Sequence, residues 1–301
     1  MAVRFFFNTL STTIVLLYLL SYASLPTGTT SIPTNTQFSS IRLGLFDGEG
    51  LSDILSSLFG GKSRGKRGSR KRRERGDGHG GAGKVLEAVS GRAKSTFILL
   101  HGVDDKASRY ASAFKMFQGL LPSTRFIFPQ AETEKLSYLK KDAASWYDIT
   151  GRRKDEPIVD EDELMKAVER LDKIIEGEID KGIKSEKIII GGLSQGGSVA
   201  LTAYMKSKRR IGGCVGVSTW MPLRDQYPKE AEDGGKDAKV LLIHGTDDKV
   251  LDYELAEKTK EALEENDRSV RLVSMKGEDH LLSGKLPKVG ALIVSFIKQN
   301  T

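Results

Sequence analysis

Residues 187–197 read Lys-Ile-Ile-Ile-Gly-Gly-Leu-Ser-Gln-Gly-Gly, and this stretch decides the fold. Its apolar run predicts a buried strand, its Gly-x-Ser-x-Gly motif predicts a sharp turn, and the Ser-Val-Ala that follows begins a helix. On such a turn Ser194 presents its hydroxyl above a sheet, while side chains at positions 192 and 196 would collide with neighbouring backbone. The N-terminus of the helix favours the negative charge that develops during acyl transfer. We therefore predict that Ser194 is a nucleophile.

A serine nucleophile needs a general base, and the chain has four histidines. His79 lies in a Gly-rich tract. His101 and His244 each end an expected strand in a His-Gly step, where we expect them to shape loops. His280 lies in a loop after the last expected strand, from which its side chain can reach over a sheet to Ser194. We predict that His280 is the base.

Short β-branched runs alternate with helical patterns from about residue 84 onward. Expected strands cover 95–100, 125–128, 187–190, 211–217, 239–243 and 269–275, and expected helices cover 107–121, 160–180, 196–206, 252–266 and 286–299. Asp160, with Glu163 three residues on, is a helix start signal. The alternation predicts a mostly parallel sheet covered by helices on both faces. Residues 85–301 are thus expected to form a single compact α/β-hydrolase domain with little or no lid domain.

In this fold the catalytic acid falls between the serine and the histidine in the chain. Asp247 and Asp248 follow the expected strand 239–243, and loop spacing alone does not separate them. One oxyanion-hole amide is expected from Gln195, which follows the nucleophile. The second is expected from Val103, in the loop after the first expected strand. These are main-chain donors, so the identity of the side chains constrains the hole little.

The N-terminus has the pattern of a targeting sequence. Residues 1–23 combine Arg4, an apolar core and small residues before a cleavage point, which predicts a signal peptide or an uncleaved signal anchor. The chain is therefore expected in the secretory pathway or at a membrane. Residues 24–84, first rich in Ser and Thr and then in Gly, Lys and Arg, are expected to be disordered. The alternative is a signal followed by a transit segment to a plastid-like organelle.

The net charge of +7 is concentrated in one short segment. Residues 62–75 hold nine Lys or Arg and one Glu, so they carry +8 and leave about −1 for the rest. This segment could touch an anionic membrane transiently or be a plain solvated linker. It contains no aromatic residue for base stacking, so no specific nucleic acid is expected. The single cysteine, Cys214, excludes an internal disulfide, and no Cys/His spacing indicates a metal site.

Three motifs in order resemble those of the acyl-protein thioesterase family, which also contains small carboxylesterases and lysophospholipases. Gly-Leu-Ser-Gln-Gly-Gly at 192–197 is similar to the family's Gly-Phe-Ser-Gln-Gly-Gly, and Ser-Trp-Tyr-Asp at 145–148 to its Ser-Trp-Phe-Asp. Ser-Thr-Trp-Met-Pro-Leu-Arg at 218–224 resembles its Ser-x-Trp-Leu-Pro-Leu-Arg. In the family's His-Gly-x-x-Asp-Pro-x-Val segment the catalytic acid is the aspartate before the proline. Asp248 occupies that position in this chain, so the resemblance favours Asp248 as the acid.

The resemblance implies hydrolysis of acyl thioesters or esters through an acyl-serine, with no metal or cofactor. The expected substrate is a fatty acyl group on a protein cysteine, and the alternative is a lysophospholipid or a small ester. Candidate pocket walls, each equally explicable as plain core, are Trp146, Trp220, Met221 and Leu223.

The chain also departs from the family pattern near the expected acyl entrance. The family's His-Gly-x-Gly-Asp loop is here His-Gly-Val-Asp-Asp, so Asp104 replaces a glycine beside the expected oxyanion hole. The family's Asn-x-Gly-Met stretch is replaced near residues 138–141. Two other classes of protein stay open: a pseudo-hydrolase that binds acylated partners without turnover, and a membrane- or RNA-binding protein that works through its basic segment.

Overall fold

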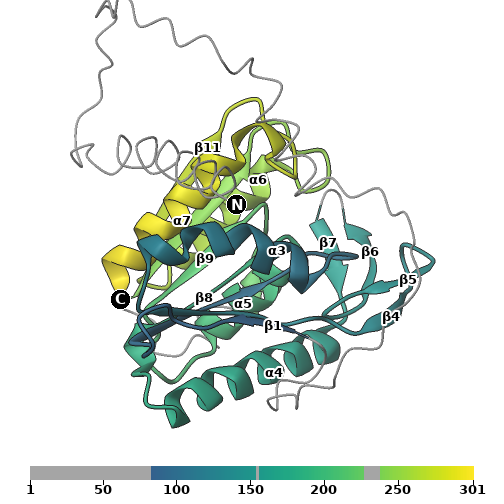
Figure 1. Cartoon of the computed structure of the whole chain (residues 1–301). Helices are drawn as coiled ribbons and strands as arrows, with labels where there is room; N and C mark the ends of the chain where they lie inside the picture. The colour runs from purple at the N-terminus through teal and green to yellow at the C-terminus, as the bar shows by residue number, and fades with distance from the viewer. Residues whose placement is uncertain (1–82, 154–155, 227–237) are drawn as a thin grey trace, which may run out of the picture. The chain divides into compact units, whose positions relative to one another are not determined.

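A seven-stranded sheet organises the part of the chain that the computed structural model describes, residues 83–153, 156–226 and 238–301 (Figure 1). In spatial order its strands are β1 (Lys84–Leu86), β3 (Thr124–Phe128), β2 (Ser95–Leu100), β8 (Ile188–Leu193), β9 (Gly213–Val217), β10 (Lys239–Gly245) and β11 (Ser269–Met275). Six neighbouring strands of this order pair in parallel: β3, β2, β8, β9, β10 and β11. At one edge of the sheet, β1 pairs antiparallel with β3. The mostly parallel sheet is confirmed.

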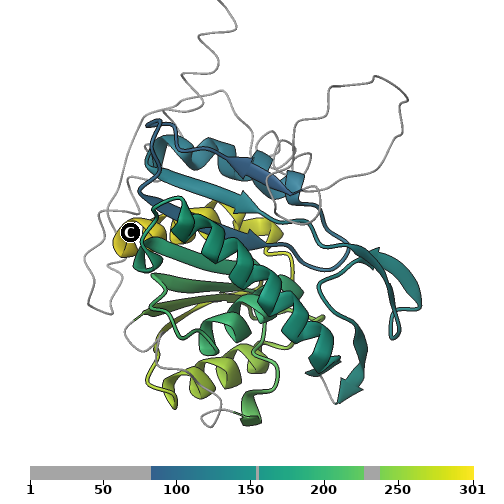
Figure 2. The same cartoon turned by 90° about the horizontal axis from the view of Figure 1, so that it is seen from below.

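Helices cover both faces of this sheet (Figures 1 and 2). They are α3 (Ala107–Phe114) with the 3-10 turn η1 (Lys115–Leu120), α4 (Glu161–Asp180), α5 (Gln195–Met205), α6 (Tyr253–Glu264) and α7 (Leu286–Asn300). Helices α4, α5 and α6 contribute to one buried cluster on one face. On the opposite face α7 packs against η1, where a Cβ on Gly290 would lie 2.6 Å from the Phe117 ring.

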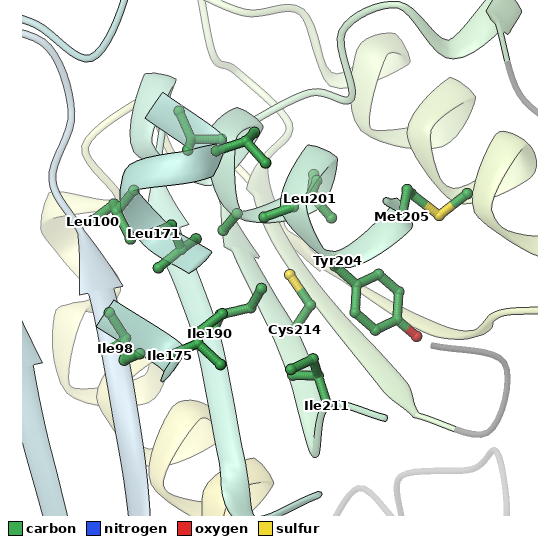
Figure 3. Close-up of a cluster of buried hydrophobic side chains, with 14 of the residues drawn as sticks. Ile98, Leu100, Leu171, Ile175, Ile190, Leu201, Tyr204, Met205, Ile211 and Cys214 are labelled. Carbon is green, nitrogen blue, oxygen red and sulfur yellow. The ribbon is translucent and has the colours of Figure 1, made fainter. Parts of the chain in front are cut away.

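The core explains why the strands read as continuous apolar runs. All six residues of β2 are buried, as are the first five of β8 and all of β9. Parallel strands covered on both faces bury every side chain, so no polar alternation remains in the sequence. Figure 3 shows one of these faces, where Ile98, Ile190 and Cys214 meet Leu171 and Leu201 of the covering helices.

Helix α4 begins where the sequence predicts, but its start is only half a capping box. The Asp160 side chain accepts a hydrogen bond from the Glu163 amide at 3.0 Å. The Glu163 carboxylate does not return this bond to Asp160; it accepts one from the Asp148 amide at 2.6 Å. Glu163 therefore fastens the start of α4 to the chain segment that precedes it.

Two hairpins between β3 and α4 were not predicted. They are formed by β4 (Thr133–Leu136) with β5 (Lys141–Ala144), and by β6 (Ile149–Arg153) with β7 (Glu156–Val159). Most of their side chains are exposed or half-buried. The two hairpins are linked by a hydrogen bond from the Tyr138 amide to the Ile149 carbonyl, at 3.1 Å.

The predicted domain boundary at residue 85 lies one residue after the start of β1. The predicted leader at 1–23 and the basic segment at 62–75 lie outside the described residues. Among the helices that the structure describes, none has the length and apolar character needed to cross a membrane.

Candidate active site

Ser194 sits on the turn between β8 and α5 in a strained conformation, with φ of 50°. This left-handed region is costly for a residue with a side chain and common at nucleophile turns. The turn closes so tightly that a Cβ on Gly192 would lie 2.2 Å from the Gly196 carbonyl carbon. A Cβ on Gly196 would lie 2.5 Å from the carbonyl oxygens of Leu100 and His101. Both glycines of the motif are therefore required by close backbone approach.

His280 links the serine to a carboxylate. Its Nδ1 lies 2.7 Å from Asp248 Oδ2, and its Nε2 lies 3.1 Å from Ser194 Oγ. An ionised carboxylate can only accept a hydrogen bond, so the proton of the neutral imidazole is held on Nδ1. Nε2 is then free to accept the serine proton, which is the arrangement that general-base activation of a hydroxyl requires.

Asp248 is the carboxylate that the fold brings to His280. Its Oδ1 accepts hydrogen bonds from the amides of Val250 at 2.8 Å and Leu251 at 2.9 Å. Its Oδ2 lies 3.1 Å from His244 Nε2 in addition to its bond with His280. Burial raises the pKa of Asp248, but the hydrogen bonds from the two histidines and Leu251 outweigh burial and hold that pKa well below its usual range.

Asp247, the other candidate acid, points to a different environment. It is exposed, and its Oδ1 accepts a hydrogen bond from Thr246 Oγ1 at 2.9 Å. Its amide donates to the Glu278 carbonyl at 3.0 Å, which fixes the turn after β10 to the loop that carries His280. Of the two aspartates, Asp248 is the one whose carboxylate contacts His280.

The loop after β2, residues 101–104, lies against the nucleophile; we call it the oxyanion loop. A Cβ on Gly102 would lie 3.4 Å from Ser194 Cβ. Val103 follows Gly102 directly, and Gln195 follows Ser194 directly, so both predicted oxyanion amides belong to residues next to this contact. Both amides therefore remain the proposed donors of an oxyanion hole.

The Gln195 side chain has a role that the sequence did not reveal. It is completely buried, and its Oε1 accepts a hydrogen bond from the Trp146 amide at 3.0 Å. Its Nε2 donates to Ser145 Oγ at 2.8 Å and to the Tyr147 carbonyl at 2.7 Å. The Ser-Trp-Tyr segment is thereby fastened to the residue that follows the nucleophile. These pairs are 48 to 50 residues apart in the chain, so no local pattern could have indicated them.

The four candidate pocket walls have different surroundings. Trp146 supports the oxyanion loop, because its indole Nε1 donates to the His101 carbonyl at 2.7 Å. Trp220 is buried beside Leu251, next to the loop that holds the acid. Leu223 is half-buried, with φ of 55°.

Met221 is core rather than pocket wall. Its side chain is 0% exposed within the main buried cluster, so no substrate entering from solvent would reach it without rearrangement of the core.

The remaining described histidines hold loops, as expected. His101 Nε2 accepts a hydrogen bond from the Ala131 amide at 3.0 Å, and its Nδ1 therefore donates to the Gly102 carbonyl at 2.7 Å. His244 Nε2 donates to the Leu251 carbonyl at 2.9 Å. His79 lies outside the described residues. Within residues 83–153, 156–226 and 238–301, no group of three His, Cys, Asp or Glu side chains is placed to hold a metal ion.

This sheet, with a serine on a strained turn hydrogen-bonded to a histidine and a buried aspartate, defines a serine hydrolase of the α/β-hydrolase class. Residues 82–293 match the model of the phospholipase/carboxylesterase family, and the chain belongs to that family. It is a serine hydrolase that cleaves carboxylic esters or thioesters.

Named relatives agree with this assignment. An acyl-protein thioesterase 1 of Cryptococcus neoformans is 32% identical over 172 residues, which cover 56% of this chain and 72% of the relative. One of Yarrowia lipolytica is 31% identical over 164 residues, which cover 53% of this chain and 72% of the relative. The crystal structure of Arabidopsis thaliana SOBER1 superposes with a TM-score of 0.64 at 26% identity, covering 69% of this chain and 99% of that one. The structure of Zea mays acyl-protein thioesterase 2 shares the fold, with a TM-score of 0.59 at 20% identity. The match covers 72% of this chain and 99% of that one.

Proposed function

We propose that this protein removes fatty acyl groups from cysteine thioesters of proteins, with Ser194, His280 and Asp248 as its catalytic triad. The observation that carries the proposal is His280, which bridges Ser194 Oγ and Asp248 Oδ2 through its two ring nitrogens. The name acyl-protein thioesterase 1, borne by relatives that are 32% and 31% identical, supports the choice of substrate.

The reaction follows from the geometry in two halves. Ser194 Oγ attacks the acyl carbonyl while His280 Nε2 takes the hydroxyl proton, and the Val103 and Gln195 amides hold the oxyanion. The tetrahedral species collapses, the carbon–sulfur bond breaks, and the thiol leaves with the proton from His280. Water then attacks the acyl-serine while His280 Nε2 takes a proton from it. The bond between the acyl carbon and Ser194 Oγ breaks, His280 returns the proton to Oγ, and the carboxylic acid leaves. Asp248 stabilises the imidazolium in both halves.

Replacement of the nucleophile tests this mechanism. We expect Ser194→Ala to lower kcat on a nitrophenyl ester by about four to six orders of magnitude. Ser112→Ala, which removes an exposed hydroxyl from α3, is the matched control and should leave kcat unchanged. Unchanged turnover in Ser194→Ala would contradict the mechanism, because hydrolysis would then not depend on the proposed nucleophile.

A second candidate function is hydrolysis of lysophospholipids or small esters. The description of the matching family, phospholipase/carboxylesterase, favours it. The two functions are separated by comparing kcat/KM of the wild-type protein on a palmitoyl-thioester peptide, a lysophospholipid and a short nitrophenyl ester. A higher kcat/KM on the lysophospholipid or the short ester would replace the thioesterase proposal.

The proposal includes a location. Residues 1–23 direct the chain to the secretory pathway or anchor it at a membrane, with a signal plus transit route to a plastid-like organelle as the alternative. Residues 62–75, with their charge of +8, would then contact an anionic membrane transiently. The N-terminus of the mature protein tests this. A start near Ser24 indicates a cleaved signal, a start near Glu74 indicates processing in the basic segment, and a start at Met1 indicates an anchor.

A further inference from the structure

The oxyanion loop is held by the β4–β5 hairpin and its two flanks. His101 Nε2 accepts a hydrogen bond from the Ala131 amide, two residues before β4. The His101 carbonyl accepts one from the indole of Trp146, two residues after β5. The Asp104 amide donates to the carbonyl of Ala144, the last residue of β5, at 2.8 Å. The position of the loop is therefore coupled to the position of the hairpin.

Asp104 adds a charge to this junction. It adopts a left-handed conformation with φ of 61°, which favours glycine, yet it carries a carboxylate. Asp104 Oδ2 lies 2.8 Å from Lys141 Nζ on β5. The two side chains are 60% and 48% exposed, and an ion pair this exposed contributes little to stability. The position of the two charges is therefore more relevant to function than the small stability that the pair contributes.

Asp104 neighbours the proposed oxyanion hole in the chain. Asp104 directly follows Val103, whose amide is to hold the oxyanion, and neighbouring Cα atoms are about 3.8 Å apart. A bare carboxylate at this position would oppose the negative charge that forms on the substrate oxygen in the transition state. The Lys141 ammonium, 2.8 Å from Asp104 Oδ2, is placed to neutralise that carboxylate.

We propose that Lys141 is a positioning residue that neutralises the Asp104 carboxylate beside the oxyanion hole. The proposal rests on the hydrolysis by Ser194 put forward above. It explains how this chain can carry an aspartate next to the hole and still be a hydrolase. The pair makes the hairpin part of the electrostatic environment of the reaction.

Single and double variants measured on a nitrophenyl ester test the pair. We expect Lys141→Met to lower kcat about three- to tenfold at low ionic strength, because it exposes the Asp104 charge. The loss should shrink in high salt, which screens exposed charges. Asp104→Asn leaves the Lys141 charge unpaired on the same loop contact and should raise kcat above wild type. The double variant, which has neither charge, should lie close to wild type. Lys135→Met, which removes an exposed lysine from the other strand of the hairpin, is the matched control for charge.

The asymmetry between the two single variants is the decisive readout. Either variant breaks the same ion pair, so a purely mechanical role predicts equal losses of kcat, independent of salt. Equal losses, or a loss in Lys135→Met as large as in Lys141→Met, would overturn the inference while Ser194-dependent hydrolysis stands. Absence of Ser194-dependent hydrolysis in the wild-type protein would count against the proposed function itself. Thermal melts of each variant establish that it is folded.

Discussion

Asp248 combines burial with ionisation because its surroundings supply donors on every side. Two backbone amides reach its Oδ1, and His280 and His244 reach its Oδ2. Donors fixed in this way stabilise the carboxylate without reorganisation when the imidazolium forms. His244 therefore belongs to the support of the site, although its own proton is shared with the Leu251 carbonyl.

The two neighbouring aspartates should respond very differently to loss of charge. We expect Asp248→Asn to lower kcat by about four orders of magnitude, because an amide at this position no longer holds the His280 proton on Nδ1. Asp247→Asn should change kcat by less than about twofold, since surface changes away from the reacting groups have small effects. Steady-state kinetics on one ester checks both variants, and similar losses in the two would contradict the assignment of the acid.

Asp248 should also make stability depend on acid pH. Its pKa in the folded protein is lowered below the value of about 3.9 that an unfolded aspartate has. Its ionisation therefore contributes stability that is complete above about pH 4 and is lost as the pH falls through the folded pKa. We expect the free energy of unfolding of Asp248→Asn to fall less steeply than that of wild type below pH 4. Denaturant titrations at several pH values check this, with Asp247→Asn expected to follow wild type.

At the scale of the elements, Gln195 joins the start of α5 to the chain that follows β5. We expect Gln195→Leu to lower the free energy of unfolding by about 2–4 kcal/mol, because the Trp146 amide and the Tyr147 carbonyl would lose their partner in a buried place. Gln299→Leu, at an exposed position on α7, is the matched control and should cost less than about 0.5 kcal/mol. Denaturant unfolding measures both, and equal values would show that Gln195 does not anchor the segment.

The sequence predicts the elements that have a clear apolar pattern and misses those that have none. Ser95–Leu100 and Ser269–Met275 were predicted to the residue, and the other internal strands within a few residues. The β4–β5 hairpin was missed because only Leu136 and Ala143 in it are buried, so it has no apolar period.

The same limit applies to the site. The motif predicts Ser194, and loop order predicts His280, because both depend on local sequence. The choice between Asp247 and Asp248 as the acid depends on which of the two adjacent carboxylates points toward His280. The anchoring by Gln195 depends on contacts across the fold. Neither can be read from a local pattern.

At the scale of the whole molecule, the site is assembled at one edge of the sheet. The oxyanion loop follows β2, Ser194 follows β8, Asp248 follows β10 and His280 follows β11. These strands are parallel, so the segments after them meet at the same edge, where α/β sheets hold their reacting groups. Every side chain of the proposed triad comes from residues 194–280.

Removal of residues 1–75 should therefore leave the chemistry intact. We expect kcat on a nitrophenyl ester to stay within about twofold of the full chain, because the sheet and the triad lie after residue 83. The same variant loses the +8 charge of residues 62–75, so its retention on anionic vesicles should fall if that segment contacts lipid. A large loss of kcat would show that the first 75 residues take part in the site.

The buried position of Cys214 has a consequence for an enzyme of this kind. It is the only cysteine in the chain, it is 0% exposed in the centre of the sheet, and burial raises the pKa of its thiol well above the usual value (Figure 3). A thioesterase works among activated acyl groups, which exchange readily onto accessible thiolates. With its sole sulfhydryl sealed in the interior, the folded enzyme offers no sulfur to which an acyl chain could migrate. Under the proposed function, the enzyme would therefore not become acylated at a cysteine of its own.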